Sequence, residues 1–94
     1  MKTLTTEEIG TLTEAHTSWK LVGGKLVRDW EFTDFAEAMG FVNRVAIMAE
    51  KADHHPDIDI RYNKVRLGLV SHDAGGITRR DAAMVAKLDE AFPA

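Results

Sequence analysis

The 94-residue chain contains no cysteine, which excludes disulfide bonds, a thiolate nucleophile and metal sites built on cysteine. It also lacks an excess of basic residues, because 12 Lys and Arg face 15 Asp and Glu for a net charge of −3. A domain that binds nucleic acid usually carries a basic stripe. No run approaches the ~18 uncharged apolar residues of a membrane span, and "MKTLTTEEIG" has no apolar signal region. We therefore expect a cytoplasmic protein with no direct nucleic-acid or membrane partner.

What the chain does have is an ordinary globular composition, with 45% hydrophobic and 29% charged residues. A chain of this length forms one domain. It buries only about two-thirds of its unfolded surface, so one two-layer core is the realistic limit. We predict a single domain over residues 1–94.

The first half of the chain predicts a helix, a hairpin and a second helix. Thr5 and Glu8 stand at capping-box spacing, which indicates a short helix over residues 5–16. Strand-type residues flank Gly23-Gly24, and such a pair accepts the positive φ angles of a tight hairpin turn. The second helix follows the N-cap Asp34, and we expect its broad apolar surface to pack against both the sheet and a neighbouring element or subunit. Its two apolar stripes are Phe35, Met39, Val42, Ala46 and Ala49, and Ala38, Phe41, Val45 and Met48.

The second half predicts two strands and a third helix. Pro56 cannot continue the second helix, which therefore ends near residue 53. The alternation in "DIDIRYNKVRLGLVSH" predicts a half-buried strand, a turn or bulge at Asn63, and a further strand. A glycine loop and a helix follow, with Thr78 and Asp81 at capping-box spacing.

This order of elements, helix-β-β-helix-β-β-helix, predicts an α+β fold. Consecutive strands joined by short turns pair antiparallel. Helices on one face of a four-stranded antiparallel sheet would form a two-layer sandwich. The opposite face and the sheet edges would stay open, which favours self-association as a homodimer or homotetramer.

Histidines and acids gather where three of these elements end or begin. If the end of the second helix, the end of the fourth strand and the start of the third helix converge, several imidazoles and carboxylates surround one pocket. An imidazole titrates near ~6.5, so such a cluster suits proton delivery and removal. The alternatives are histidines that are only polar surface residues, and an aspartate that only caps a helix. The candidates are Asp53, His54, His55, His72, Asp73 and Asp81.

A metal site is a competing hypothesis, because two histidines and an aspartate can hold zinc or iron. However, His54 and His55 are adjacent and do not share a helix face, unlike the histidines of an HExxH motif. We therefore predict no metal, and the alternative of a metal-dependent hydrolase is open to elemental analysis.

The window "EKADHHPDIDIRYNKVRLGLVSHDAGGITRRD" resembles the active-site pattern of the pterin-4a-carbinolamine dehydratases, whose animal members are also called dimerisation cofactors. That pattern is an acid, His-His-Pro, an aromatic residue, a third histidine and a more distant aspartate. "GFVNRVAIMAE" and "YNKV" match the family as well. One departure is Ile58, where many members have an aromatic residue. The matching positions are Glu50, His54, His55, Pro56, Tyr62, His72 and Asp81.

The resemblance implies dehydration of 4a-hydroxytetrahydropterin to quinonoid dihydropterin. This hydro-lyase reaction belongs to tetrahydrobiopterin recycling after aromatic amino acid hydroxylation and needs no cofactor. By position, His54 and His72 would be the acid/base pair, and His55 would chiefly hold the pterin. The resemblance also offers a second class of function, a non-catalytic protein-binding module that acts as a transcriptional coactivator or an assembly factor.

The predicted substrate-binding residues complete this hypothesis. Glu50, Asp53 and Asp81 would orient the imidazoles or bind the amino-pyrimidine edge of the pterin. We place Ser71 and Trp19 in the same set, with a core position as the alternative for Trp19.

Overall fold

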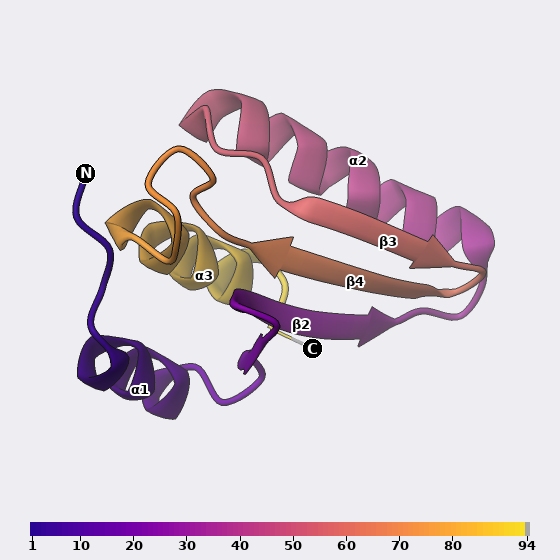
Figure 1. Cartoon of the computed structure of the whole chain (residues 1–94). Coiled ribbons are helices and arrows are strands. Elements are labelled where there is room, and N and C mark those ends of the chain that lie inside the picture. The colour runs from indigo at the N-terminus through magenta and orange to yellow at the C-terminus, as the bar shows by residue number, and fades with distance from the viewer. Residues whose placement is uncertain (94) are drawn as a thin grey trace.

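The computed structural model describes residues 1–93, and within that range it has three helices and four strands. Their order is the predicted helix-β-β-helix-β-β-helix (Figure 1). None of the helices in residues 1–93 combines the length and the hydropathy that crossing a membrane requires. The elements are α1 (Thr6–Ala15), β1 (Lys20–Val22), β2 (Lys25–Glu31), α2 (Phe35–Ala52), β3 (Asp57–Arg61), β4 (Lys64–Leu69) and α3 (Arg79–Ala91).

Helix α2 begins and ends at the residues that the sequence marks. The side chain of Asp34 accepts a hydrogen bond from the backbone N–H of Glu37 at 2.8 Å, which caps the helix. At the other end Asp53 adopts the left-handed region, with φ 50° and ψ 41°. Asparagine and aspartate tolerate this region better than most residues do. Pro56 then prevents a return to helix, so the chain leaves α2 through His54.

The four strands form one antiparallel sheet in the order β1-β2-β4-β3. Helices α2 and α3 lie on the same face of this sheet (Figure 1). On that face Leu26 and Trp30 of β2 lie opposite Leu69 and Val65 of β4, and all four are buried. The structure therefore confirms the predicted α+β sandwich. The helices contribute Ala38, Phe41, Val45, Met84, Val85 and Leu88 to the core.

The other face of the sheet is charged. Asp29 of β2 lies opposite Arg66 of β4, which donates two hydrogen bonds to the Asp29 carboxylate at 2.8 and 3.1 Å. These hydrogen bonds outweigh the effect of burial and hold the pKa of Asp29 below its ordinary value. Both side chains are more than half exposed, so water and salt screen this ion pair and it adds little stability.

The predicted half-burial of β3 is wrong. Its residues are exposed except for Ile60, which is partly buried, and Ile58 is 39% exposed. The physical reason is the position of β3 at the edge of the sheet, where it pairs only with β4. An alternating sequence indicates two different faces of a strand, but it does not indicate whether helices cover either face.

Helix α2 is buried on one side only. The stripe of Ala38, Phe41 and Val45 enters the core. The other stripe is only partly covered: Phe35 is 51% exposed and Ala46 is exposed, whereas Met39 and Val42 are partly buried and Ala49 is buried. That a neighbouring subunit covers the exposed part of this stripe stays a prediction.

The C-terminal half of α3 is anchored by Asp89. One carboxylate oxygen accepts hydrogen bonds from the indole N–H of Trp19 at 2.7 Å and from Nη1 of Arg28 at 2.5 Å. The other oxygen lies 2.7 Å from Nδ1 of His16. Arg28 is only 6% exposed, and its guanidinium lies 4.2 Å from the ring centre of Trp30. Asp89 therefore ties the end of α1 and strand β2 to α3.

The charge of Asp89 is maintained by these contacts. Burial by itself would raise the pKa of Asp89. The hydrogen bonds from Trp19, His16 and Arg28 together outweigh burial and hold the pKa below its ordinary value. Asp89 therefore stays ionised beside the buried Arg28.

Candidate active site

The centre of the candidate site is a buried pair formed by His54 and Asp81. Nε2 of His54 lies 2.6 Å from Oδ1 of Asp81. Asp81 is fully buried and His54 is 8% exposed. His54 comes from the segment that leaves α2, and Asp81 from the first turn of α3. The structure thus confirms that these two element ends converge.

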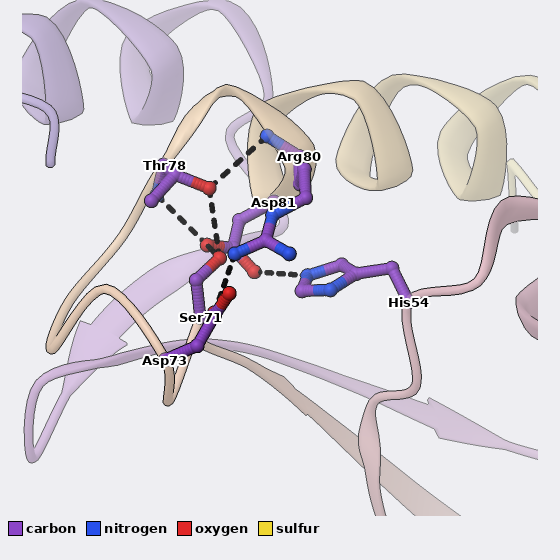
Figure 2. A network of polar contacts seen from close by, with 6 residues as sticks. All are labelled: His54, Ser71, Asp73, Thr78, Arg80 and Asp81. Carbon is purple, nitrogen blue, oxygen red and sulfur yellow. Dashed lines mark hydrogen bonds and ion pairs between the residues drawn. The ribbon is translucent and has the colours of Figure 1, made fainter. Parts of the chain in front are cut away.

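The second oxygen of Asp81 receives two further hydrogen bonds (Figure 2). The hydroxyl of Ser71 donates to Oδ2 at 2.9 Å, and the backbone N–H of Thr78 donates to it at 2.8 Å. A backbone N–H can only donate, so Oδ2 of Asp81 accepts, and the N-terminal end of helix α3 favours a negative charge on this carboxylate. Asp81 is therefore an acceptor on both oxygens.

This arrangement determines how His54 can react. An ionised carboxylate only accepts hydrogen bonds, so Nε2 of His54 carries a hydrogen and donates it to Asp81. Nδ1 is then the nitrogen left for another partner. A histidine held in one tautomer, with one nitrogen free, is the arrangement that general acid–base catalysis requires.

The other two histidines of the predicted site, His55 and His72, are exposed. Nε2 of His55 lies 2.8 Å from Oε2 of Glu50, and these two side chains are 57% and 77% exposed. His72 lies in the tight loop between β4 and α3, where its backbone carbonyl accepts a hydrogen bond from Gly75 at 3.2 Å. Within residues 1–93, no hydrogen bond joins the side chain of His72 to His54 or His55. The structure therefore buries one of the three predicted histidines and leaves two at the surface.

Two of the predicted substrate-binding residues, Trp19 and Ser71, are buried. Trp19 is 1% exposed and donates to Asp89, so it belongs to the core. Trp19 precedes β1, and the helical spacing in α3 does not indicate that Asp89 pairs with it. Ser71 is also 1% exposed, and its hydroxyl donates its hydrogen to Asp81. Asp53, by contrast, is exposed beside His54.

Sequence reasoning missed Arg80. Its Nη2 donates to Oδ1 of Asp73 at 2.5 Å, and this hydrogen bond, more than any other contact, holds the pKa of Asp73 below its ordinary value (Figure 2). Nε of Arg80 is buried without a hydrogen-bond partner in the described part of the chain. The available signal was its position beside Asp81 in "TRRD", a stretch that by itself indicates only a small basic cluster.

Two hollows on the molecular surface lie away from His54 and Asp81. One, of about 560 Å³, is on the charged face of the sheet, and the other, of about 820 Å³, is beside the N-terminal segment. Neither is lined by a histidine, so the cleft predicted around the three histidines is not one of them. Among residues 1–93, no three His, Asp or Glu side chains are arranged as ligands for one metal ion.

Comparisons with known proteins agree with the resemblance found in the sequence. Residues 2–91 match the family described as pterin 4 alpha carbinolamine dehydratase. A protein of Acidobacterium capsulatum is 58% identical over 72 residues, which are 77% of this chain and 78% of that protein. It carries the provisional name pterin-4-alpha-carbinolamine dehydratase.

Two solved structures are also similar. The crystal structure of a transcriptional coactivator/pterin dehydratase from Brucella melitensis has a TM-score of 0.87 and 35% identity, over 95% of this chain and 97% of that one. A pterin dehydratase-like RuBisCO assembly factor of the α-carboxysome has a TM-score of 0.65 and 24% identity, over 80% of this chain and 89% of that one. The second likeness concerns the fold alone.

Proposed function

The chain belongs to the pterin 4 alpha carbinolamine dehydratase family, a family of lyases, and we propose that it dehydrates 4a-hydroxytetrahydropterin to quinonoid dihydropterin by histidine acid–base catalysis. The observation that carries this proposal is the buried contact of 2.6 Å between His54 and Asp81. Within residues 1–93 it leaves Nδ1 of His54 without a hydrogen-bond partner, at the position that matches the histidine pattern of the family.

The proposed reaction needs two proton transfers. The bond between C4a and the hydroxyl oxygen breaks, and the departing hydroxyl takes up a proton to leave as water. N5 loses its proton, and the electron pair of the N5–H bond forms the new double bond to C4a. The net change is the loss of one water, with no oxidation or reduction.

The histidines divide these tasks in the proposal. His54 exchanges its proton through Nδ1, because Asp81 holds Nε2. His72 performs the complementary transfer, and its exposed side chain is accessible to a small molecule. His55, paired with Glu50, binds the pterin. Positioned acids and bases contribute roughly 10²- to 10⁴-fold each, which suits a reaction that already proceeds slowly in water.

We expect the wild-type protein to accelerate the loss of a 4a-hydroxytetrahydropterin, and His72→Ala to lower kcat on the order of 10²-fold. The substitution should not change the free energy of unfolding, because the side chain of His72 is exposed and lies outside the core. A stopped-flow assay with pterin freshly produced by a hydroxylase measures the rates of the wild type and the variant. Urea denaturation measures their free energies of unfolding. A wild-type rate equal to the uncatalysed rate would refute the function. An unchanged rate in His72→Ala alone would refute only the role of His72.

Asp53→Gly tests the binding role of the Asp53 carboxylate without disturbing the left-handed backbone at the end of α2. Glycine adopts the left-handed conformation of Asp53 without steric cost, so stability should be kept or slightly raised. If the carboxylate binds the pterin, its loss should lower kcat/KM roughly 10- to 100-fold, mostly through KM. Steady-state kinetics beside a urea titration test this prediction. Unchanged kcat/KM in a stable variant would remove Asp53 from the binding set.

A further inference from the structure

We infer that Thr78 and Ser71 are positioning residues, whose buried hydroxyl groups fix Asp81 and, through it, the reactive orientation of His54. The inference rests on the proposed function, since it concerns the same histidine. It assigns a role to Thr78, and it replaces the substrate-binding role predicted for Ser71.

The hydrogens of this cluster can be assigned by counting donors. Ser71 has one hydroxyl hydrogen and donates it to Asp81. In its 2.7 Å contact with Thr78 the oxygen of Ser71 must therefore accept, so the hydroxyl of Thr78 donates. The oxygen of Thr78 in turn accepts from the backbone N–H of Arg80 at 3.2 Å. The donors therefore run in one series, from the N–H of Arg80 through the hydroxyls of Thr78 and Ser71 to Asp81, and Figure 2 shows the contacts between these residues.

Helix capping alone does not explain this arrangement. Thr5 and Glu8 form the same capping box at the start of α1, yet both residues are exposed and their hydrogen bonds are local. At α3 the equivalent box of Thr78 and Asp81 is fully buried. It also carries Ser71 on one oxygen of the acid and His54 on the other, from distant parts of the chain. The additional contacts all converge on the acid that holds His54.

Ser71 also fixes the loop that bears His72. Its backbone N–H donates to the carbonyl of Gly76 at 2.9 Å. Its carbonyl accepts from Ala74 and Gly75, both at 3.0 Å. The backbone of Ser71 is thus held inside the loop, and its side chain is held on Asp81. Ser71 therefore sets the position of the residue next to it, His72, relative to His54.

Neither hydroxyl is available to a substrate. Thr78 is fully buried and Ser71 is 1% exposed. Their loss should therefore change the chemical step and leave substrate binding nearly intact. A hydroxyl that contacted the pterin would instead raise KM when removed.

The test compares Ser71→Ala, Thr78→Val and Thr78→Ser with the matched control Thr5→Val. We expect the first two to lower kcat roughly tenfold, with KM changed less than about twofold. Thr78→Ser keeps the hydroxyl and should restore most of kcat. Thr5→Val loses a helix cap of the same kind at an exposed position, so it should destabilise the protein less than Thr78→Val does, with kcat unchanged. Loss of kcat in Thr5→Val equal to that in Thr78→Val would overturn the inference, because stability alone would then explain the effect.

A second measurement does not depend on activity. Above neutral pH, nitrogen-15 spectra of the His54 ring should show the Nε2–H tautomer in the wild type. In Ser71→Ala and Thr78→Val the two nitrogen shifts should move toward each other, as the tautomers mix. Identical shifts in all variants would refute the positioning role even if the wild type were active. An inactive wild type with the expected shifts would refute the proposed function and leave the positioning intact.

Discussion

Asp81→Asn should lower kcat on the order of 10³-fold while the protein stays folded. The amide oxygen of the introduced asparagine can still accept from Ser71 and from the N–H of Thr78. Its NH₂ group then faces Nε2 of His54 and donates to it, so the ring must carry its hydrogen on Nδ1. His54 would be held in the opposite tautomer, with its unprotonated nitrogen directed at the new amide in place of the substrate.

Single-turnover stopped-flow measurements on the wild type and Asp81→Asn test this prediction. Asp29→Asn is the matched control, since it makes the same chemical change in an exposed ion pair on the charged face of the sheet. The control should retain the wild-type kcat. A fall of less than about tenfold in Asp81→Asn would mean that the tautomer of His54 does not limit the reaction.

Asp89→Asn should have the largest effect on folding, a loss of about 3 kcal/mol in the free energy of unfolding near neutral pH. The carboxylate accepts from Arg28 and Trp19 and lies against His16. Removing its charge leaves Arg28, which is 6% exposed, as a buried cation without a counter-ion. Breaking one partner of such a pair costs far more than the pair contributes as a whole.

The effect of Asp89→Asn should depend on pH. The pKa of Asp89 is lowered in the folded protein, so its stabilising contribution is present above its unfolded pKa, about 3.9. That contribution is lost as the pH falls through the folded value, because the native carboxylate must then take up a proton. The difference in the free energy of unfolding between wild type and variant should therefore be largest near neutral pH and shrink below about pH 4.

Urea denaturation at several pH values measures both parts of this prediction. Asp29→Asn again serves as the control and should lose much less stability, because its ion pair with Arg66 is exposed. Replacing both partners, as in Asp89→Leu with Arg28→Met, should recover most of the lost stability. Equal losses for Asp89→Asn and Asp29→Asn would contradict the anchoring role of Asp89.

The order of elements could be predicted because it is encoded locally. Thr5, Asp34 and Thr78 mark helix starts by hydrogen bonds to residues in the first turn that follows. Pro56 and the Gly23-Gly24 turn mark ends by backbone geometry, and both glycines have positive φ as a tight hairpin demands. Once these ends were placed, the topology allowed His54 and Asp81 to meet, and the structure shows that they do.

What could not be predicted depends on contacts between distant residues. Asp89 meets Trp19 and Arg28 across 70 and 61 positions, and no local pattern indicates which buried cation a helix acid will meet. The same limit applies to Ser71, where exposure and hydroxyl direction decide between binding a substrate and supporting Asp81. The exposure of β3 depends on its place at the sheet edge, which alternation does not encode.

Helix α3 holds Asp81 near one end and Asp89 near the other; Asp81 is fixed to Ser71 just beyond β4, and Asp89 to Arg28 of β2. One residue inserted between them would lengthen the helix by about 1.5 Å and rotate one end by about a third of a turn relative to the other. Both aspartates could not then face their partners at once. Natural length variation in relatives should therefore be confined to the loops, such as residues 72–76, and be absent from this eight-residue spacing.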